Sequence, residues 1–185
     1  IVEQYVEEKL ALITPVFCLG YKENHEIPER TIKETIGKSL LLDMVAGQSS
    51  DLYKELLDSG LINDSFSTEY FNGHGYAVPM FSGESLDPKK VAKLIDEKIS
   101  YYKEKGFSDE EFEIVRKKHY SKTVRAFTDV DTIANGLVVS HFDNDDLFSE
   151  FKVLQEITAE YCYELLKNSF NKDLAVLSVV MPKEI

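Results

Sequence analysis

The sequence predicts one α/β domain of the two-layer α+β type, in which helices pack on one face of a mostly antiparallel sheet. Two observations predict this fold. Runs rich in β-branched and aromatic residues lie near both ends of the chain and in its centre, as expected of strands. Between these runs, apolar residues recur every three or four positions, as expected of helices that pack on a core. A chain of 185 residues is long enough to bury such a core within a single domain.

The first part of the chain predicts a linker, a strand and a helix. Residues 1–9 are short and charged, and we expect a linker or the end of a helix from an upstream domain. The apolar run Ala11–Tyr21 predicts a buried strand, followed by a polar loop at 23–28. Over Glu29–Gly47 a helix is predicted, because every fourth residue is apolar: Ile32, Ile36, Leu40 and Met44.

The central stretch Ser49–Gly83 predicts a helix and then a β-hairpin. Apolar residues at helical spacing follow Ser49-Ser50-Asp51 and stop at Gly60: Leu52, Tyr53, Leu56 and Leu57. Two aromatic-rich runs, Phe66–Phe71 and Tyr76–Phe81, flank Asn72-Gly73, a dipeptide that favours a type I′ turn. Because Pro79 has no backbone N–H, we expect the second strand to lie at or near a sheet edge.

The last part of the chain predicts helices and a closing strand. Asp87-Pro88 is a typical helix start, and that helix ends at Gly106. Ser108 and Glu111 form a capping-box pattern for the next helix. Three more helical segments are expected, over Asp129–Val139, around Phe148 and from Thr158 onward, and Leu174–Met181 predicts the final strand.

Charge and hydropathy exclude several classes of function. The chain has 33 acidic and 21 basic residues, a net charge of -12 and no dense Lys/Arg cluster, which argues against a nucleic-acid partner. No apolar run approaches the length that spans a bilayer and no leader opens the chain, so no membrane association and a cytoplasmic location are expected. The acidic charge is typical either of a solvated surface or of a binding surface that prefers basic peptides.

The residues alone predict no active site and no metal site. The four histidines, His25, His74, His119 and His141, lack the mutual spacing of zinc ligands, and His119 is predicted to be a hydrogen-bonded core residue. The acidic run Asp143–Asp146 lacks the glycine and glutamate of a calcium loop. Gly73-His74-Gly75 is not a dinucleotide fingerprint, and Cys18 and Cys162 are predicted to be free thiols.

The order of these motifs resembles a known family. The segment Ser50–Phe66, the hairpin, Ser82-Gly83, the Asp87-Pro88 helix and Gly106–Glu111 together look like the C-terminal domain of pitrilysin/insulinase-family zinc peptidases, in the processing-peptidase-like subgroup. The resemblance implies one domain of a two-domain half, with two halves closing around a peptide chamber. It also implies that zinc binds a His-x-x-Glu-His helix in the preceding domain, so this fragment needs no cofactor and is not catalytic.

The resemblance further implies partners and two site positions. The partners would be the upstream peptidase domain, a second peptidase half in the same chain or a paralogous subunit, and a peptide substrate. The family often has a substrate-holding Arg and Tyr, and the matching positions here are Leu57 and Asn63. Neither side chain can supply that chemistry, so no catalytic or substrate-binding residue is assigned.

Three functions remain open from the sequence. The first is a non-catalytic domain of a zinc peptidase that lines the chamber and the inter-domain interface. The second is a catalytically dead scaffold that partners an active paralogue. The third is a peptide-binding module that uses an exposed sheet edge along Tyr76–Phe81 for strand addition.

Overall fold

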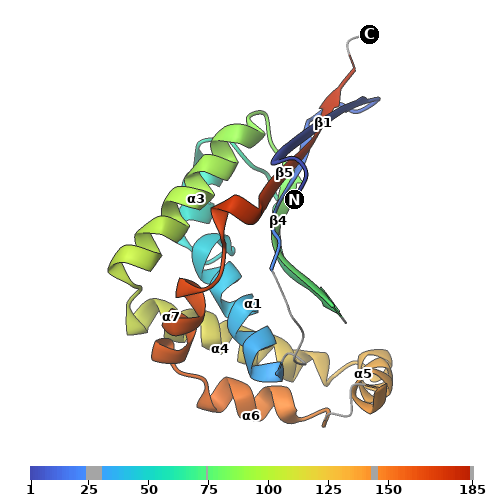
Figure 1. The fold of residues 1–185 in the computed structure, drawn as a ribbon. Coiled ribbons are helices and arrows are strands. Elements are labelled where there is room, and N and C mark those ends of the chain that lie inside the picture. Colours follow the sequence, from blue (N-terminus) through green and yellow to red (C-terminus); the bar gives the residue numbers. More distant parts are fainter. Residues whose placement is uncertain (24–30, 74, 143–145, 184–185) are drawn as a thin grey trace.

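The chain folds into one sheet with helices on one side of it (Figure 1). The structure, a computed structural model, describes residues 1–23, 31–73, 75–142 and 146–183. Within these ranges there are seven α-helices, one short 3-10 helix and five strands. The predicted two-layer α/β class is confirmed.

The five strands form a mixed, mostly antiparallel sheet in the order β1-β5-β2-β4-β3. Strands β1 and β5 are parallel, and the other neighbouring pairs are antiparallel. Strand β3 therefore lies at one edge of the sheet and β1 at the other. The strands are β1 Tyr5–Leu10, β2 Val16–Tyr21, β3 Ser67–Gly73, β4 Tyr76–Glu84 and β5 Ala175–Pro182.

Four of the described helices begin at the capping residues that the sequence predicts. Ser50, Asp87, Ser108 and Thr158 each accept a hydrogen bond from a backbone N–H in the first turn of the helix that follows. The Ser108–Glu111 capping box is present. The helices are α1 Ile32–Ala46, α2 Asp51–Asp58, α3 Pro88–Lys105, α4 Asp109–Ala126, α5 Val130–Phe142, α6 Ser149–Glu156 and α7 Ala159–Lys167, and the 3-10 helix is Lys172–Leu174.

The core lies between the sheet and the helices, and α1 runs through its centre (Figure 1). On β2, Phe17, Leu19 and Tyr21 alternate with more exposed residues, so one face of the strand is buried. Helix α1 buries almost every residue from Leu40 to Ala46 because strands, α4, α6 and α7 surround it.

Two local predictions were wrong. Residues 1–9, expected to be a linker, contain strand β1, whose hydrogen-bonded partner is β5 near the other end of the chain. Local sequence does not reveal a pairing across such a distance. Asn72-Gly73 is not the hairpin turn, because both residues belong to β3 and pair with Ala77 and Tyr76. The turn contains Gly75, whose φ of 81° favours glycine.

Pro79 lies one strand away from the edge. Strand β4 pairs with β3 from Tyr76 to Ser82, whereas its pairing with β2 runs only from Met80 to Glu84. Pro79 therefore lies just outside the ladder with β2, one residue before Met80. The backbone N–H that proline lacks costs little at this position. The prediction of a position near the edge is correct, but the edge strand is β3 rather than Tyr76–Phe81.

Several boundaries differ from the predictions, and some lie outside the described residues. The first buried strand begins at Val16 rather than Ala11. Most of the predicted loop at 23–28, the helix start at Glu29, and Asp143–Asp145 fall outside the described ranges. Among the helices that the structure describes, none combines the length and hydrophobicity needed to cross a membrane.

Candidate functional site

One face of the sheet is not covered by the helices, which gather on the opposite side (Figure 1). We call this surface the open face. Side chains alternate along each strand, so the open-face positions are those between the buried residues. They comprise Val6, Glu8 and Leu10 of β1, Val176, Ser178, Val180 and Pro182 of β5, Val16, Cys18 and Gly20 of β2, Tyr76, Val78, Met80, Ser82 and Glu84 of β4, and Ser67, Glu69, Phe71 and Gly73 of β3.

The strand register arranges these side chains in rows across the sheet. In one row, Glu8, Val180, Val16 and Glu84 are neighbours on four successive strands, so a carboxylate lies at each end of an apolar pair. A second row contains Val176, Gly20, Met80 and Glu69. The row between these two contains Val6, Ser178, Cys18, Ser82 and Ser67. Apolar side chains of the open face therefore lie on both sides of a row of small, mostly polar residues, and carboxylates lie toward the margins.

Side chains of the open face are closely packed across β2, β4 and β3. The sulfur atoms of Cys18 and Met80 are 3.8 Å apart, and the rings of Phe71 and Tyr76 lie 5.3 Å apart. A Cβ atom at Gly20 would lie 2.8 Å from Val78 Cγ1, so the side chain of Val78 covers this glycine. Burial, and secondarily the charge of Glu69, raise the pKa of the Cys18 thiol.

Asn63 lies beside one end of this face, and Leu57 lies in the preceding helix. Leu57 is at the end of α2 and is 38% exposed. Asn63 lies in the following loop, where its Nδ2 donates to Glu84 Oε2 at 2.7 Å and its Oδ1 accepts from the Ser65 N–H at 2.9 Å. Asn63 therefore holds a loop against the end of β4, a structural role that the sequence did not reveal.

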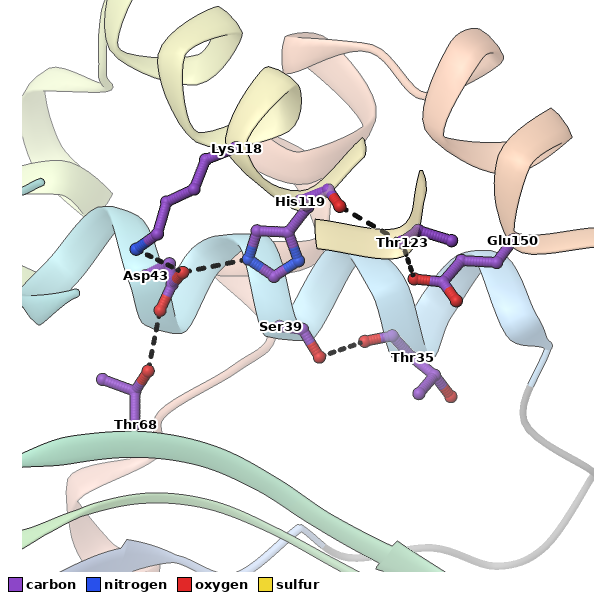
Figure 2. Close-up of polar contacts among 8 residues, drawn as sticks. All are labelled: Thr35, Ser39, Asp43, Thr68, Lys118, His119, Thr123 and Glu150. Atoms are coloured by element: carbon purple, nitrogen blue, oxygen red, sulfur yellow. Dashed lines mark hydrogen bonds and ion pairs between the residues drawn. The ribbon is translucent and has the colours of Figure 1, made fainter. Parts of the chain in front are cut away.

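A polar cluster centred on Asp43 lies on the other side of the sheet, among the helices (Figure 2). Asp43 of α1 accepts hydrogen bonds from Thr68 of β3 at 2.8 Å and from Lys118 of α4 at 3.2 Å. Its Oδ2 is also 3.0 Å from Nε2 of His119. Burial alone would raise the pKa of Asp43, but the hydrogen bonds from His119 and Thr68 and the charge of Lys118 lower it.

This Asp43 cluster separates two cavities along β3. A cavity of about 650 Å³ opens between α1, α4, α5 and α6, and one of about 310 Å³ opens beside α2. Asp43, Thr68, His119 and Lys122 line both cavities. The two cavities therefore follow one another along the edge strand of the sheet.

The predicted role of His119 is confirmed, whereas Asp43 was not singled out. His119 is a hydrogen-bonded, largely buried histidine, with 18% of its side chain exposed. The only local signal for Asp43 is a single carboxylate within the apolar run Leu40–Ala46. Its partners Thr68 and His119 come from distant segments, so only the fold brings them together.

The described histidines do not form a zinc site. Asp43 and His119 provide only two donors, and Lys118 occupies the carboxylate that a metal would need. In the described ranges, no three His, Cys, Asp or Glu side chains are grouped to hold a metal ion. His141 is exposed on α5, and His25 and His74 lie outside the described residues. The two cysteines are free thiols, as predicted.

Comparison with known proteins identifies the fold and its relatives. The family model described as peptidase M16 inactive domain matches residues 17–119. A zinc protease of Bacillus subtilis, YmfH, which is described as uncharacterised, is 25% identical over 179 residues. A solved M16-like peptidase from Alicyclobacillus acidocaldarius superimposes with a TM-score of 0.90 at 23% identity over 97% of this chain.

A further solved structure matches the chain almost end to end. The inactive peptidase domain of a zinc protease from Bordetella parapertussis has a TM-score of 0.77 at 17% identity, and the match covers 96% of this chain and 95% of that one. By contrast, this chain spans only 42% of the B. subtilis protein and 44% of the A. acidocaldarius chain. At these identities, the structural matches establish the shared fold.

Proposed function

Because this chain belongs to the peptidase M16 inactive-domain family, we propose that it is the non-catalytic domain of a zinc-dependent peptidase and that its open face forms part of the peptide chamber wall. The B. subtilis relative is named a zinc protease, in keeping with this parent activity. The proposal places zinc and the general base in another domain, on a His-x-x-Glu-His helix.

The observation that carries this proposal is the open face. A sheet that is solvent-exposed on one side normally alternates apolar residues inside with polar residues outside. Here the exposed side carries Val16 and Val180 on one side of the row that contains Cys18, and Met80 and Val78 on the other. An exposed apolar surface of this kind is typical of a site that contacts another molecule. A substrate peptide in a closed chamber would supply that contact.

A chamber of which this domain forms one wall needs further domains to close it. An upstream peptidase domain would pack against this domain, and a second peptidase half, in the same chain or in a paralogous subunit, would close the chamber. Leu57 and Asn63 cannot hold substrate as an Arg and a Tyr would. We therefore propose that such an Arg and Tyr lie in another domain of the peptidase, or that the half containing this domain does not need them.

A catalytically dead scaffold is the alternative within the same family. Zinc content and peptide cleavage distinguish the scaffold from a domain of an active peptidase. Both are measured on the parent protein, purified with and without co-expressed paralogues. A non-catalytic domain of an active peptidase predicts stoichiometric zinc and cleavage of a fluorogenic peptide by the parent alone. A parent that contains no His-x-x-Glu-His helix, or that cleaves only after a paralogue is added, supports the scaffold instead.

Strand addition at the edge of the sheet is the second candidate function. Strand β3 is an edge strand, and two cavities lie beside Phe66–Tyr70 on its helix side. An extended peptide paired with β3 could place side chains in these cavities. Hydrogen exchange tests this candidate, because bound peptide would protect backbone amides of β3 while leaving those of β1 unchanged.

A further inference from the structure

The larger cavity, between α1, α4, α5 and α6, has the dimensions of a small-molecule site. Its volume is about 650 Å³, within the range of roughly 300–1,000 Å³ that is usual for ligand pockets. Apolar side chains from separate elements line it: Ile36 of α1, Ile133 of α5, Phe127 after α4 and Leu147 before α6. The ring of Phe127 packs against that of Phe151, with centroids 5.0 Å apart. The cavity therefore offers an apolar ligand group a ready-made surface.

Two opposite charges line the same cavity without pairing with each other. They are Lys122 of α4 and Glu150 of α6. In the part of the chain that the structure describes, neither side chain forms an ion pair. Thr123 directly follows Lys122 and donates its hydroxyl to Glu150 Oε1 at 2.7 Å (Figure 2). The two charges therefore belong to neighbouring parts of the cavity wall, and Glu150 Oε2 is left without a donor.

Other carboxylates around the cavity are already neutralised or lie outside it. The carboxylate of Asp43 is 3.2 Å from the ammonium group of Lys118. Glu69 borders the cavity as part of the edge strand β3, but the strand register places its side chain on the open face. Among the described residues of the wall, Lys122 and Glu150 are therefore the two charges that remain for a ligand.

We propose that this cavity binds a zwitterionic α-amino acid with a large apolar side chain. The ligand carboxylate pairs with Lys122, and its ammonium group donates to Glu150 Oε2. Its side chain contacts Ile36, Phe127 and Ile133. A ligand with one charge would leave one wall charge without a partner in a partly closed site, which costs binding free energy. The cavity lies in the helix layer, across the sheet from the open face, so this inference is independent of the proposed function.

The test is a titration of this chain, labelled with ¹⁵N, with L-phenylalanine and two analogues. Phenylalanine should shift the resonances of Lys122, Ile133 and Gly136, which line the cavity. N-acetylphenylalanine lacks the ammonium group, and phenylalaninamide lacks the carboxylate. Each analogue should bind roughly 10-fold more weakly, because one charge-assisted contact is lost. Equal affinity for all three compounds, or no shift with phenylalanine, would overturn the inference.

Charge variants assign each ligand group to its partner. Lys122→Gln should bind phenylalanine and phenylalaninamide equally well, and Glu150→Gln should bind phenylalanine and N-acetylphenylalanine equally well. Glutamine at position 150 can still accept the hydroxyl of Thr123, so the fold is retained. The matched controls are Lys117→Gln and Glu156→Gln, exposed positions on the same two helices that do not line the cavity. A loss of affinity in the controls equal to that in the cavity variants would make net charge responsible and contradict the inference.

A cavity-filling variant tests where the apolar group of the ligand lies. Ala126 lines the cavity from α4, and Ala126→Phe should abolish binding without lowering the thermal unfolding midpoint. Unchanged binding by this variant would place the ligand elsewhere and overturn the inference. An extended peptide with blocked termini provides the last outcome. If it shifts the same resonances and protects backbone amides of β3, whereas phenylalanine does not, the cavity serves strand addition instead.

Discussion

The side-chain amide of Asn63 donates a 2.7 Å hydrogen bond to Glu84 Oε2 and so joins the loop after α2 to the end of β4. Its Oδ1 also accepts from Ser65. Asn63→Ala should destabilise the fold by about 1 kcal/mol, because these exposed hydrogen bonds are lost without leaving a buried group unpaired. Leu57→Arg should change stability by less than about 0.5 kcal/mol, since Leu57 is 38% exposed. Urea unfolding measures both, and equal effects would contradict the structural role of Asn63.

The Asp43 cluster predicts a specific dependence of stability on pH. The pKa of Asp43 is lowered in the folded state, so the unfolded state binds more protons at acidic pH. The stabilisation from ionised Asp43 is therefore fully present above its ordinary pKa of 3.8 and is lost as pH falls through the lower, folded-state value. Asp43→Asn should cost about 1–3 kcal/mol near neutral pH.

Unfolding measured across a pH series tests this prediction. The difference in unfolding free energy between the unmodified chain and Asp43→Asn should be constant from neutral pH down to about pH 5 and then shrink. A difference that is independent of pH throughout would show that Asp43 acts without its charge.

A buried ion pair makes Lys38 a sensitive position. Lys38 is 4% exposed, and its Nζ pairs with Glu23 and donates to Ser169 Oγ at 2.7 Å. Glu23 also accepts from the hydroxyl of Tyr70 at 2.8 Å. Lys38→Met should destabilise the fold by about 3–5 kcal/mol, because it removes the ammonium group from a buried ion pair. The double variant Lys38→Met/Glu23→Gln should recover part of that loss in thermal or urea unfolding, and no recovery would contradict this explanation.

Gly83 is predicted to tolerate no side chain. A Cβ atom at this position would lie 2.8 Å from the backbone Cα of Phe66, which cannot rotate away. Gly83→Ala should therefore destabilise the fold by about 1–3 kcal/mol, as overpacking does. Gly106, at the end of α3, has its nearest such contact at 3.8 Å, but its φ of 77° also disfavours a side chain. Circular dichroism melts of both variants measure the cost, and an unchanged midpoint for Gly83→Ala would contradict the close approach.

These positions show which features local sequence can predict. Helix starts at Ser50, Asp87 and Ser108 were predictable because a cap and its partner lie within three residues. The hairpin register was not, since Gly75 rather than Asn72-Gly73 forms the turn. Strand β1 and the Asp43–His119 contact depend on residues far apart in the chain, which no local pattern encodes.

The two thiols provide a final prediction about the open face. Cys18 is half-buried on that face, whereas Cys162 is 0% exposed and burial raises its pKa to about 12. A maleimide probe should therefore label Cys18 much faster than Cys162, because both exposure and thiolate fraction favour it. Glu69 raises the pKa of Cys18, so Glu69→Gln should lower that pKa and speed labelling at pH 8. Faster labelling of Cys162 than of Cys18 would contradict the described packing of the open face.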